Sequence, residues 1–249
     1  MKAVLVAGGH GSRLLPFTRY THKTLLPLHR RPVIDYALAT IRHSGIKDIT
    51  IIGNQFIEQI SQHVGDGLDD ENINYVVEEE PLGVHHAISL ARPHVEGSRL
   101  LVYFSDNITT WDLSEAVAEF TKAEDSPGCA LLCREVADPE RFGVAVFDDN
   151  GKLCDIIEKP TTAPSNFAIG GIYLFDESFW SRMDVAYHDK GNDFSISDVN
   201  RDYLRDGKVT LHQIGEEIWL DCGTPGSLLE AATHAKSGRL PLAGEEVEE

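Results

Sequence analysis

A glycine-rich turn near the start of the chain carries the first candidate chemistry. Gly8, Gly9 and Gly11 directly follow a short apolar run that is typical of a buried parallel strand. Glycines let a ligand approach the backbone closely, and the exposed N–H groups of such a turn form an anion site. Arg13 and Lys23 add positive charge downstream. This order predicts a polyphosphate site; the alternative is an ordinary strand-to-helix turn with two solvated basic residues.

Neither of the two common phosphate loops is present. The pattern G-x-x-x-x-G-K-[ST] is absent because Lys23 lies too far from Gly8, and the dinucleotide spacing G-x-G-x-x-G also fails. We therefore expect no helix directly after the glycines, but an extended arm over residues 14–31. The next helix is expected to begin at Pro32, a favourable residue for a first helical turn.

Two aspartates follow predicted strands. Asp106 comes after the apolar run 99–104, and Asp221 ends a short strand before a glycine turn. Carboxylates at the carboxyl ends of strands in an open α/β sheet point into its crevice. A pair of them suits Mg²⁺, which takes few protein oxygens and keeps phosphates and waters as its other ligands. Taken singly, each aspartate also fits a turn or a helix cap.

Bulk properties narrow the class of protein. The 249 residues suffice for one large α/β domain, and the formal net charge of −18 argues against nucleic acid as a partner. The sequence has no apolar run of transmembrane length and no signal-peptide pattern, so we expect a cytoplasmic protein with no membrane partner. Four scattered cysteines predict reduced thiols rather than disulfides or a zinc site.

Hydrophobic periodicity predicts an α/β fold with a doubly wound, Rossmann-like mixed sheet. Strands are expected at 3–7, 48–52, 74–77 and 99–104, and helices at 32–43, 55–64, 83–92 and 113–123. The second half predicts strands at 129–134, 144–147, 153–158, 167–175, 209–213 and 218–220, and helices at 197–205 and 225–236. We expect one domain, 1–240, with a nucleotide-binding half (about 1–125) and a smaller β-rich, sugar-binding half (about 126–240). Residues 241–249 form an acidic tail that we expect to be disordered.

The arrangement over residues 8–27 resembles a known signature. Written out, it is G-G-x-G-x-R-L-x-P-x-T followed by K-x-L-L-P. It is similar to the signature of the sugar-1-phosphate nucleotidylyltransferases, and most similar to the short form of the glucose-1-phosphate thymidylyltransferases. The resemblance extends from Met1 to about Lys236. It implies an enzyme that takes an NTP and a sugar 1-phosphate as substrates and uses Mg²⁺.

The resemblance also implies roles for individual residues. Catalytic roles fall to Arg13, Lys23 and Lys159, and metal binding falls to Asp106 and Asp221. The implied nucleotide-binding residues are Gly8, Gly9, Gly11, Ser12, Arg13, Glu78, Gly83 and Asp106. The implied sugar-phosphate-binding residues are Asn107, Gly143, Glu158, Lys159, Ile169 and Tyr173. The chain departs from the family at Ser105, where glycine is usual, and at Phe142, where tyrosine is common.

The nucleotide base stays open because of Glu78, which directly follows the strand ending at Val77. Thymidylyltransferases typically have glutamine at the matching position, which both donates and accepts. A carboxylate only accepts, so it suits the adjacent N1–H and N2–H₂ donors of guanine and repels thymine O4. The stretch E-x-x-P-L-G also resembles sugar-1-phosphate guanylyltransferases. The alternatives are therefore a guanylyltransferase or an enzyme that accepts several bases.

The expected reaction is an in-line attack of the sugar phosphate on the α-phosphorus of the NTP, which needs positioning and charge stabilisation rather than a side-chain nucleophile. One rival is a non-catalytic regulatory homologue that binds sugar nucleotides, but the chain keeps every expected cation and carboxylate. A retaining glycosyltransferase would need an Asp-x-Asp at a strand end, and the sequence has none there. Relatives often form dimers or tetramers, so a homo-oligomer stays open.

Overall fold

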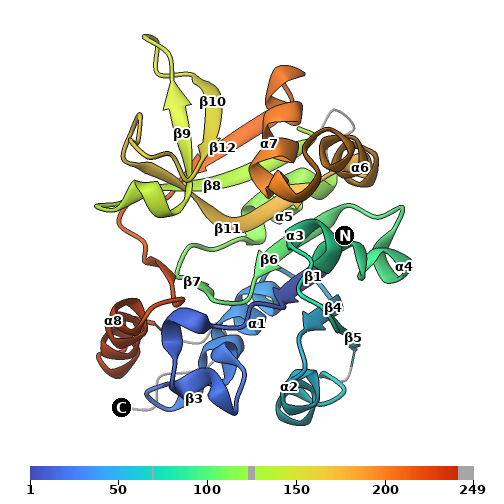
Figure 1. Cartoon of the computed structure of the whole chain (residues 1–249), viewed down its shortest axis with the longest axis vertical. Coiled ribbons are helices and arrows are strands. Elements are labelled where there is room, and N and C mark those ends of the chain that lie inside the picture. Colours follow the sequence, from blue (N-terminus) through green and yellow to red (C-terminus); the bar gives the residue numbers. More distant parts are fainter. Residues whose placement is uncertain (69, 123–126, 241–249) are drawn as a thin grey trace.

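The computed structural model describes residues 1–68, 70–122 and 127–240. The acidic tail and the final residue of the helix expected at 113–123 lie outside this part. Figure 1 shows one group of strands above the other. The two groups meet where β6 (Leu100–Phe104) pairs with β11 (Phe167–Phe175). No helix within the described ranges is long and apolar enough to cross a membrane.

The first half of the chain forms a parallel sheet in the order β6-β1-β4-β5. Its other strands are β1 (Lys2–Ala7), β4 (Asp48–Gly53) and β5 (Asn72–Val77). β1 pairs in parallel with both β4 and β6, so the winding direction reverses beside β1. Ligands of doubly wound sheets bind outside the carboxyl ends of strands at this reversal. Gly8 and Asp106 follow those two strand ends.

The second half adds antiparallel strands to the same sheet. They are β8 (Cys129–Glu135), β9 (Gly143–Phe147), β10 (Leu153–Glu158) and β11, with β12 (Val209–Gln213) parallel to β8. β11 pairs with β9 at Ala168–Ile169 and then with β6 from Ile172 onward. It therefore changes neighbours at Gly170 and Gly171 and joins the two halves. The predicted α/β fold with a mixed sheet is confirmed.

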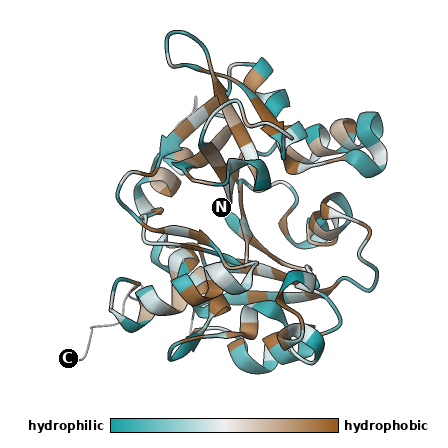
Figure 2. Cartoon of the chain, turned by 60° about the vertical axis from the view of Figure 1, so that its left-hand side comes forward, coloured by the Kyte–Doolittle hydropathy of each residue, from teal (hydrophilic) through white to brown (hydrophobic). Residues whose placement is uncertain are grey.

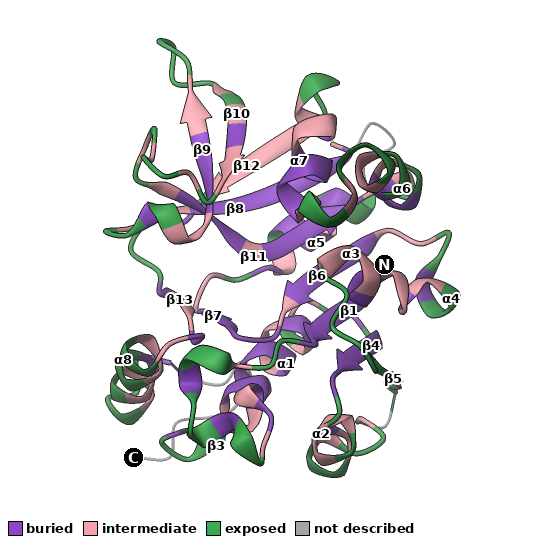
Figure 3. Cartoon of the chain, in the orientation of Figure 1, coloured by how far each residue is buried: buried purple, intermediate pink, exposed green. Residues whose placement is uncertain are grey.

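Helices cover both faces of the sheet because successive residues of β1 point to opposite sides. Ala3, Leu5 and Ala7 pack in one cluster with α1 (Val33–His43) and α5 (Ser114–Lys122). Val4 and Val6 pack in the other cluster, with several helices on that side. These are α3 (Val84–Ser89), α4 (Arg92–Val95), α6 (Phe179–Lys190) and α7 (Ile196–Arg205). Buried, apolar strands lie inside and exposed, polar helix faces lie outside (Figures 2 and 3).

A short ribbon crosses between the two halves. β7 (Asn107–Thr109) pairs with β13 (Trp219–Asp221) in an antiparallel ladder, separate from the main sheet. After it comes α8 (Pro225–Lys236), which begins at a capping box formed by Thr224 and Ser227. α2 (Ile57–Val64) and the small β2 (Pro27–Leu28) and β3 (Arg31–Pro32) pair complete the fold.

Two sequence-based expectations were wrong, and one helix was not predicted. The arm over 14–31 is not extended, because single helical turns occupy Ser12–Leu14, Phe17–Arg19 and Lys23–Leu25. The helix expected at 83–92 is split, and Pro93 lies in the first turn of α4, where its missing N–H costs nothing. The helix that was not predicted is α6. Only Phe179, Trp180 and Met183 of that helix are buried, so an apolar stripe is absent from its last two turns.

Candidate active site

The glycine turn holds its shape through Gly11. This residue adopts the left-handed conformation (φ 63°), which is unfavourable for other residues, and its carbonyl accepts a 2.8 Å hydrogen bond from Thr18 Oγ1. A helical turn, Ser12–Leu14, begins directly afterwards, contrary to the sequence expectation of no helix there. This turn places Arg13 on the exposed side of the loop.

Lys23 is presented by the third helical turn of the arm. His22 caps this turn, and its Nδ1 accepts from the backbone N–H of Thr24 at 3.2 Å. Burial, together with the charge of Lys23, lowers the pKa of His22 to about 4, so the imidazole is neutral at physiological pH. The ammonium of Lys23 forms an ion pair with Asp106 Oδ2. A Cβ on Gly9 would lie only 3.1 Å from Lys23 Nζ, so the glycine turn and the lysine are in contact.

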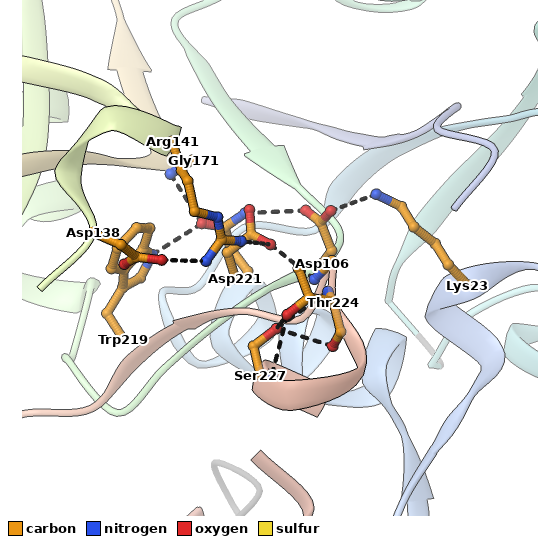
Figure 4. Close-up of polar contacts among 11 residues, drawn as sticks. Lys23, Asp106, Asp138, Arg141, Gly171, Trp219, Asp221, Thr224 and Ser227 are labelled. Atoms are coloured by element: carbon orange, nitrogen blue, oxygen red, sulfur yellow. Dashed lines mark hydrogen bonds and ion pairs between the residues drawn. The ribbon is translucent and has the colours of Figure 1, made fainter. Parts of the chain in front are cut away.

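The two predicted metal carboxylates lie at neighbouring ends of strands. Asp106 follows β6 and Asp221 ends β13, and the N–H of Cys222 donates to the Asp106 carbonyl at 2.8 Å. Burial by itself raises the pKa of Asp106, but the charge and hydrogen bond of Lys23 hold the pKa below its ordinary value. Burial and then the negative charge of Asp106 raise the pKa of Asp221. Figure 4 shows both carboxylates with Lys23 on the far side of Asp106.

Arg13 reaches this acidic pair from the glycine turn. A Cβ on Gly223 would lie 2.6 Å from Asp221 Oδ1 and 2.7 Å from Arg13 Nη2, so the two groups meet at this glycine. The charge of Arg13 also lowers the pKa of Asp221, against the larger effect of burial. Positive and negative side chains that are far apart in the sequence therefore converge on one place.

A cavity of about 440 Å³ opens beside these residues, a size typical of small-molecule sites. It brings together the predicted metal and sugar-phosphate residues with two of the predicted nucleotide residues, Arg13 and Asp106. Those that line it are Arg13, Asp106, Asn107, Gly143, Glu158, Lys159, Ile169, Tyr173 and Asp221. The cavity therefore spans the carboxyl ends of the parallel strands and the antiparallel strands of the second half.

Glu158 and Lys159 form the far wall of the cavity at the end of β10. Lys159 Nζ lies 3.0 Å from Glu158 Oε1, and Lys159 has a left-handed backbone (φ 40°), which costs energy for a residue with a side chain. Ser197 Oγ donates a 2.7 Å hydrogen bond to the other oxygen, Glu158 Oε2. A Cβ on Gly143 would lie 2.8 Å from Ser197 Oγ, so a side chain there would disturb the contact between Ser197 and Glu158.

Glu78 is buried against the glycine turn. It is 6% exposed, and a Cβ on Gly8 would lie 2.0 Å from Glu78 Oε2. Within the described residues its carboxylate accepts no hydrogen bond. Burial raises the pKa of Glu78, and the nearby imidazoles of His86 and His10 oppose this effect. A carboxylate that accepts no hydrogen bond there and lies beside a phosphate-type turn is suited to contact a ligand.

Replacing Glu78 with glutamine is expected to raise the thermal midpoint of the apo protein at pH 8. The pKa of Glu78 is higher in the folded protein than in the unfolded chain. Ionisation of Glu78 therefore destabilises the fold above that pKa and has no effect on stability below the ordinary value of about 4.3. The gain should therefore shrink as the pH falls. Thermal melts of both proteins from pH 4 to 8 measure this difference. Glu79→Gln, on the same turn but exposed, is the control; equal gains for the two variants would contradict the prediction.

Seven predicted residues do not line the cavity: Gly8, Gly9, Gly11, Ser12, Lys23, Glu78 and Gly83. Ser12 is exposed in the first helical turn, and Gly83 (φ 100°) precedes α3, whose first residue, Val84, does line it. The segment Phe194–Ile196, at the start of α7, also lines the cavity and was not predicted from the sequence. Its signal was the capping box of Ser195 and Asp198, because Ser195 is the N-cap of a helix that begins at Ile196, one residue before the predicted start. The neutral cap His22 was also missed, and no sequence pattern indicates it.

Comparison with known proteins identifies the family. Residues 2–238 match the family model described as "Nucleotidyl transferase". The chain belongs to the nucleotidyl transferase family. It is 36% identical to a glucose-1-phosphate thymidylyltransferase of Xanthomonas campestris, over 93% of this chain and 79% of that protein. It is 35% identical to a low-salt glycan biosynthesis nucleotidyltransferase of Haloferax volcanii, over 93% of this chain but only 65% of the relative's length.

Solved structures agree with this membership of the nucleotidyl transferase family. A Bacillus anthracis protein assigned as a glucose-1-phosphate thymidylyltransferase superposes with a TM-score of 0.86 at 32% identity, over 100% of this chain and 98% of that one. Apo UDP-glucose pyrophosphorylase superposes with a TM-score of 0.81 at 21% identity, over 96% and 99% of the two chains, which shows a shared fold. The sequence-based assignment to this enzyme family is confirmed.

Proposed function

We propose that the protein transfers a nucleoside monophosphate from an NTP to a sugar 1-phosphate, producing an NDP-sugar and pyrophosphate. The observation that carries the proposal is the convergence of Arg13, Asp106 and Asp221, with Lys23 paired to Asp106, at a cavity that Glu158 and Lys159 also line. Two phosphate-bearing substrates need two separate sets of cations. The cavity provides one set at the glycine turn and another at the end of β10.

The reaction is a displacement at the α-phosphorus. A phosphate oxygen of the sugar 1-phosphate forms the new bond, the bond to the bridging oxygen of the β-phosphate breaks, and pyrophosphate leaves with that oxygen. The attacking phosphate is already an anion, so no side-chain base is needed. Arg13 stabilises charge on the α-phosphate and the leaving pyrophosphate, Lys23 holds phosphate oxygens, and Lys159 holds the incoming phosphate.

Asp106 and Asp221 are suited to Mg²⁺. Their backbones are in contact, because Cys222, the neighbour of Asp221, donates to the Asp106 carbonyl. Burial and then the charge of Asp106 raise the pKa of Asp221, as expected for two carboxylates that need a shared cation. Bound there, Mg²⁺ would screen the charge of the triphosphate. The described residues include no group of three or more potential metal-ligating side chains. Two carboxylates with phosphates and waters match the usual ligands of Mg²⁺.

We propose glucose 1-phosphate, or a close analogue, as the sugar substrate. The Xanthomonas relative is named for this substrate. The cavity wall provides a carboxylate for hydroxyl groups, Glu158, held in place by Ser197, and an ammonium for the phosphate, Lys159. The same relative is named as a thymidylyltransferase, which favours dTTP as the nucleotide.

Glu78 supports a second candidate for the nucleotide, GTP. Its buried carboxylate has no hydrogen-bond donor within the described ranges and lies against Gly8. Guanine presents two adjacent N–H donors that match two carboxylate oxygens, whereas thymine presents carbonyl oxygens on both sides of one N–H. With thymine bound, the carboxylate of Glu78 would face a carbonyl oxygen. Leaving these two acceptors unpaired costs about 1–3 kcal/mol.

Pyrophosphate release from purified protein tests the proposed function. The assay crosses dTTP, UTP, GTP, CTP and ATP with several sugar 1-phosphates in the presence of Mg²⁺. Turnover with at least one pair is expected. No release with any pair, despite nucleotide binding, would instead support a non-catalytic sugar-nucleotide-binding protein.

The Glu78→Gln variant tests the choice of base. Glutamine adds a donor while keeping an acceptor, so the ratio of kcat/KM for dTTP over GTP is expected to rise by about tenfold or more, the equivalent of one recovered hydrogen bond. Wild type and variant are compared in the same pyrophosphate assay, with Glu79→Gln as the control. A wild type that clearly prefers dTTP, with an unchanged ratio in the variant, would contradict a guanine-selective role for Glu78.

A further inference from the structure

The side-chain amide of Asn107 connects three separate elements. Asn107 begins β7 and is 3% exposed. Its Oδ1 accepts hydrogen bonds from the indole Nε1–H of Trp219 in β13, at 2.9 Å, and from the backbone N–H of Gly171 in β11, at 3.0 Å. These two bonds use both lone pairs of the amide oxygen. The oxygen is therefore unavailable to a ligand.

These donors also fix which way the amide faces. A flipped amide would place its NH₂ group against two N–H donors, which excludes that orientation. The NH₂ group consequently faces Asp106, and Nδ2 donates to Asp106 Oδ1 at 3.1 Å. Gly171 is necessary for this packing, because a Cβ there would lie 2.6 Å from Nδ2 of Asn107. The three residues that make these contacts, Asp106, Gly171 and Trp219, are labelled in Figure 4.

The carboxylate of Asp106 is thereby held from two sides. Asn107 binds Oδ1, and the ammonium of Lys23 pairs with Oδ2. When a triphosphate attracts Lys23, the contact with Asn107 still holds the carboxylate in place. Trp219 and Gly171, which orient Asn107, also line the cavity beside the proposed sugar site.

We propose that Asn107 is a positioning residue that orients Asp106 for the metal, instead of a ligand of the sugar 1-phosphate as the family resemblance implied. The proposal rests on the function proposed above. Groups that orient metal ligands in this way typically change metal affinity by 10–100-fold when removed. A sugar ligand would instead change the KM for the sugar phosphate.

Mn²⁺ binding to the full-length protein, measured by electron paramagnetic resonance with a non-hydrolysable NTP analogue, separates these roles. Asn107→Ala is expected to weaken Mn²⁺ binding by about tenfold while the KM for the sugar 1-phosphate changes little. Trp219→Phe removes the indole donor but keeps a ring, and is expected to weaken Mn²⁺ binding in the same direction by a smaller factor.

Two matched controls are available in the chain. Trp180 and Asn200 are also buried, and their Nε1 and Nδ2 groups have no hydrogen-bond partner within the described part of the chain. Trp180→Phe and Asn200→Ala remove the same atoms without touching the cavity, so their Mn²⁺ affinity should equal that of the wild type.

Two results would each overturn the proposed role of Asn107. Unchanged Mn²⁺ affinity in Asn107→Ala, with a raised KM for the sugar 1-phosphate, would overturn it. If that variant does not fold, unchanged affinity in Trp219→Phe would overturn it equally. A wild type that binds Mn²⁺ with the analogue but releases no pyrophosphate from any substrate pair would reject the proposed function instead, and the metal measurements would still report on Asn107.

Discussion

Replacing Arg13 with alanine is expected to lower turnover by about 10²–10³-fold, the usual effect of removing one donor that stabilises the transition state. The guanidinium extends from the exposed loop to the glycine beside Asp221. In the proposed reaction, this is where the α-phosphate and the leaving pyrophosphate gain charge. Alanine leaves that charge unbalanced at the point where it develops. Pre-steady-state measurement of pyrophosphate release under saturating substrates gives the effect on the chemical step.

Arg19→Ala provides the control for this prediction. Arg19 lies on the same arm, is exposed, and does not line the cavity. Its turnover should equal that of the wild type. Arg13→Lys keeps the charge but loses the planar donor pair, so an intermediate rate is expected. Turnover of Arg13→Ala within about threefold of the wild type would exclude the residue from the mechanism.

Replacing Asp106 with asparagine is expected to lower turnover by at least about 10²-fold, because screening of the triphosphate by a metal is worth several kcal/mol. The change removes one of two carboxylates and also leaves the Lys23 ammonium facing a neutral amide. The Mg²⁺ concentration needed for half-maximal activity should rise. A magnesium titration of the pyrophosphate assay, together with Mn²⁺ binding, measures both effects.

Asp70→Asn is the matched control for this change. Asp70 also forms an ion pair with a lysine, Lys47, at 3.0 Å, but both partners are exposed and far from the cavity lining. Exposed pairs of this kind contribute little. The control should keep the wild-type rate and magnesium dependence. Equal magnesium dependence in the wild type and in Asp106→Asn would remove Asp106 from the metal site.

The sequence was sufficient for the parts of the site that follow strands. Gly8 and Asp106 come directly after apolar runs, and the topology of a doubly wound sheet places the ends of these two strands together. Glu158 and Lys159 were identified only through a family resemblance, since a lysine after a strand is normally solvated. The periodicity of the strands predicted the mixed sheet because each strand is short, apolar and bounded by turn residues.

Other features depend on contacts that no local pattern encodes. The arm after the glycines is folded because His22 caps a turn from its own buried position, and burial is not visible in the sequence. The hydrogen bonds of Asn107 come from residues 64 and 112 positions away. The role of Asn107 could therefore be assigned only from the three-dimensional arrangement.

Because the site includes the ribbon of β7 and β13, it can be completed only late in synthesis and folding. It pairs Asn107 with Asp221 across more than 100 positions, and the Asn107–Trp219 bond spans 112. Contacts of such separation form slowly, and amino-terminal segments emerge first during synthesis. A nascent chain that stops short of β13 already holds the glycine turn and Asp106, yet lacks its acidic partner. In the proposed function, the site is therefore complete only after β13 has been synthesised.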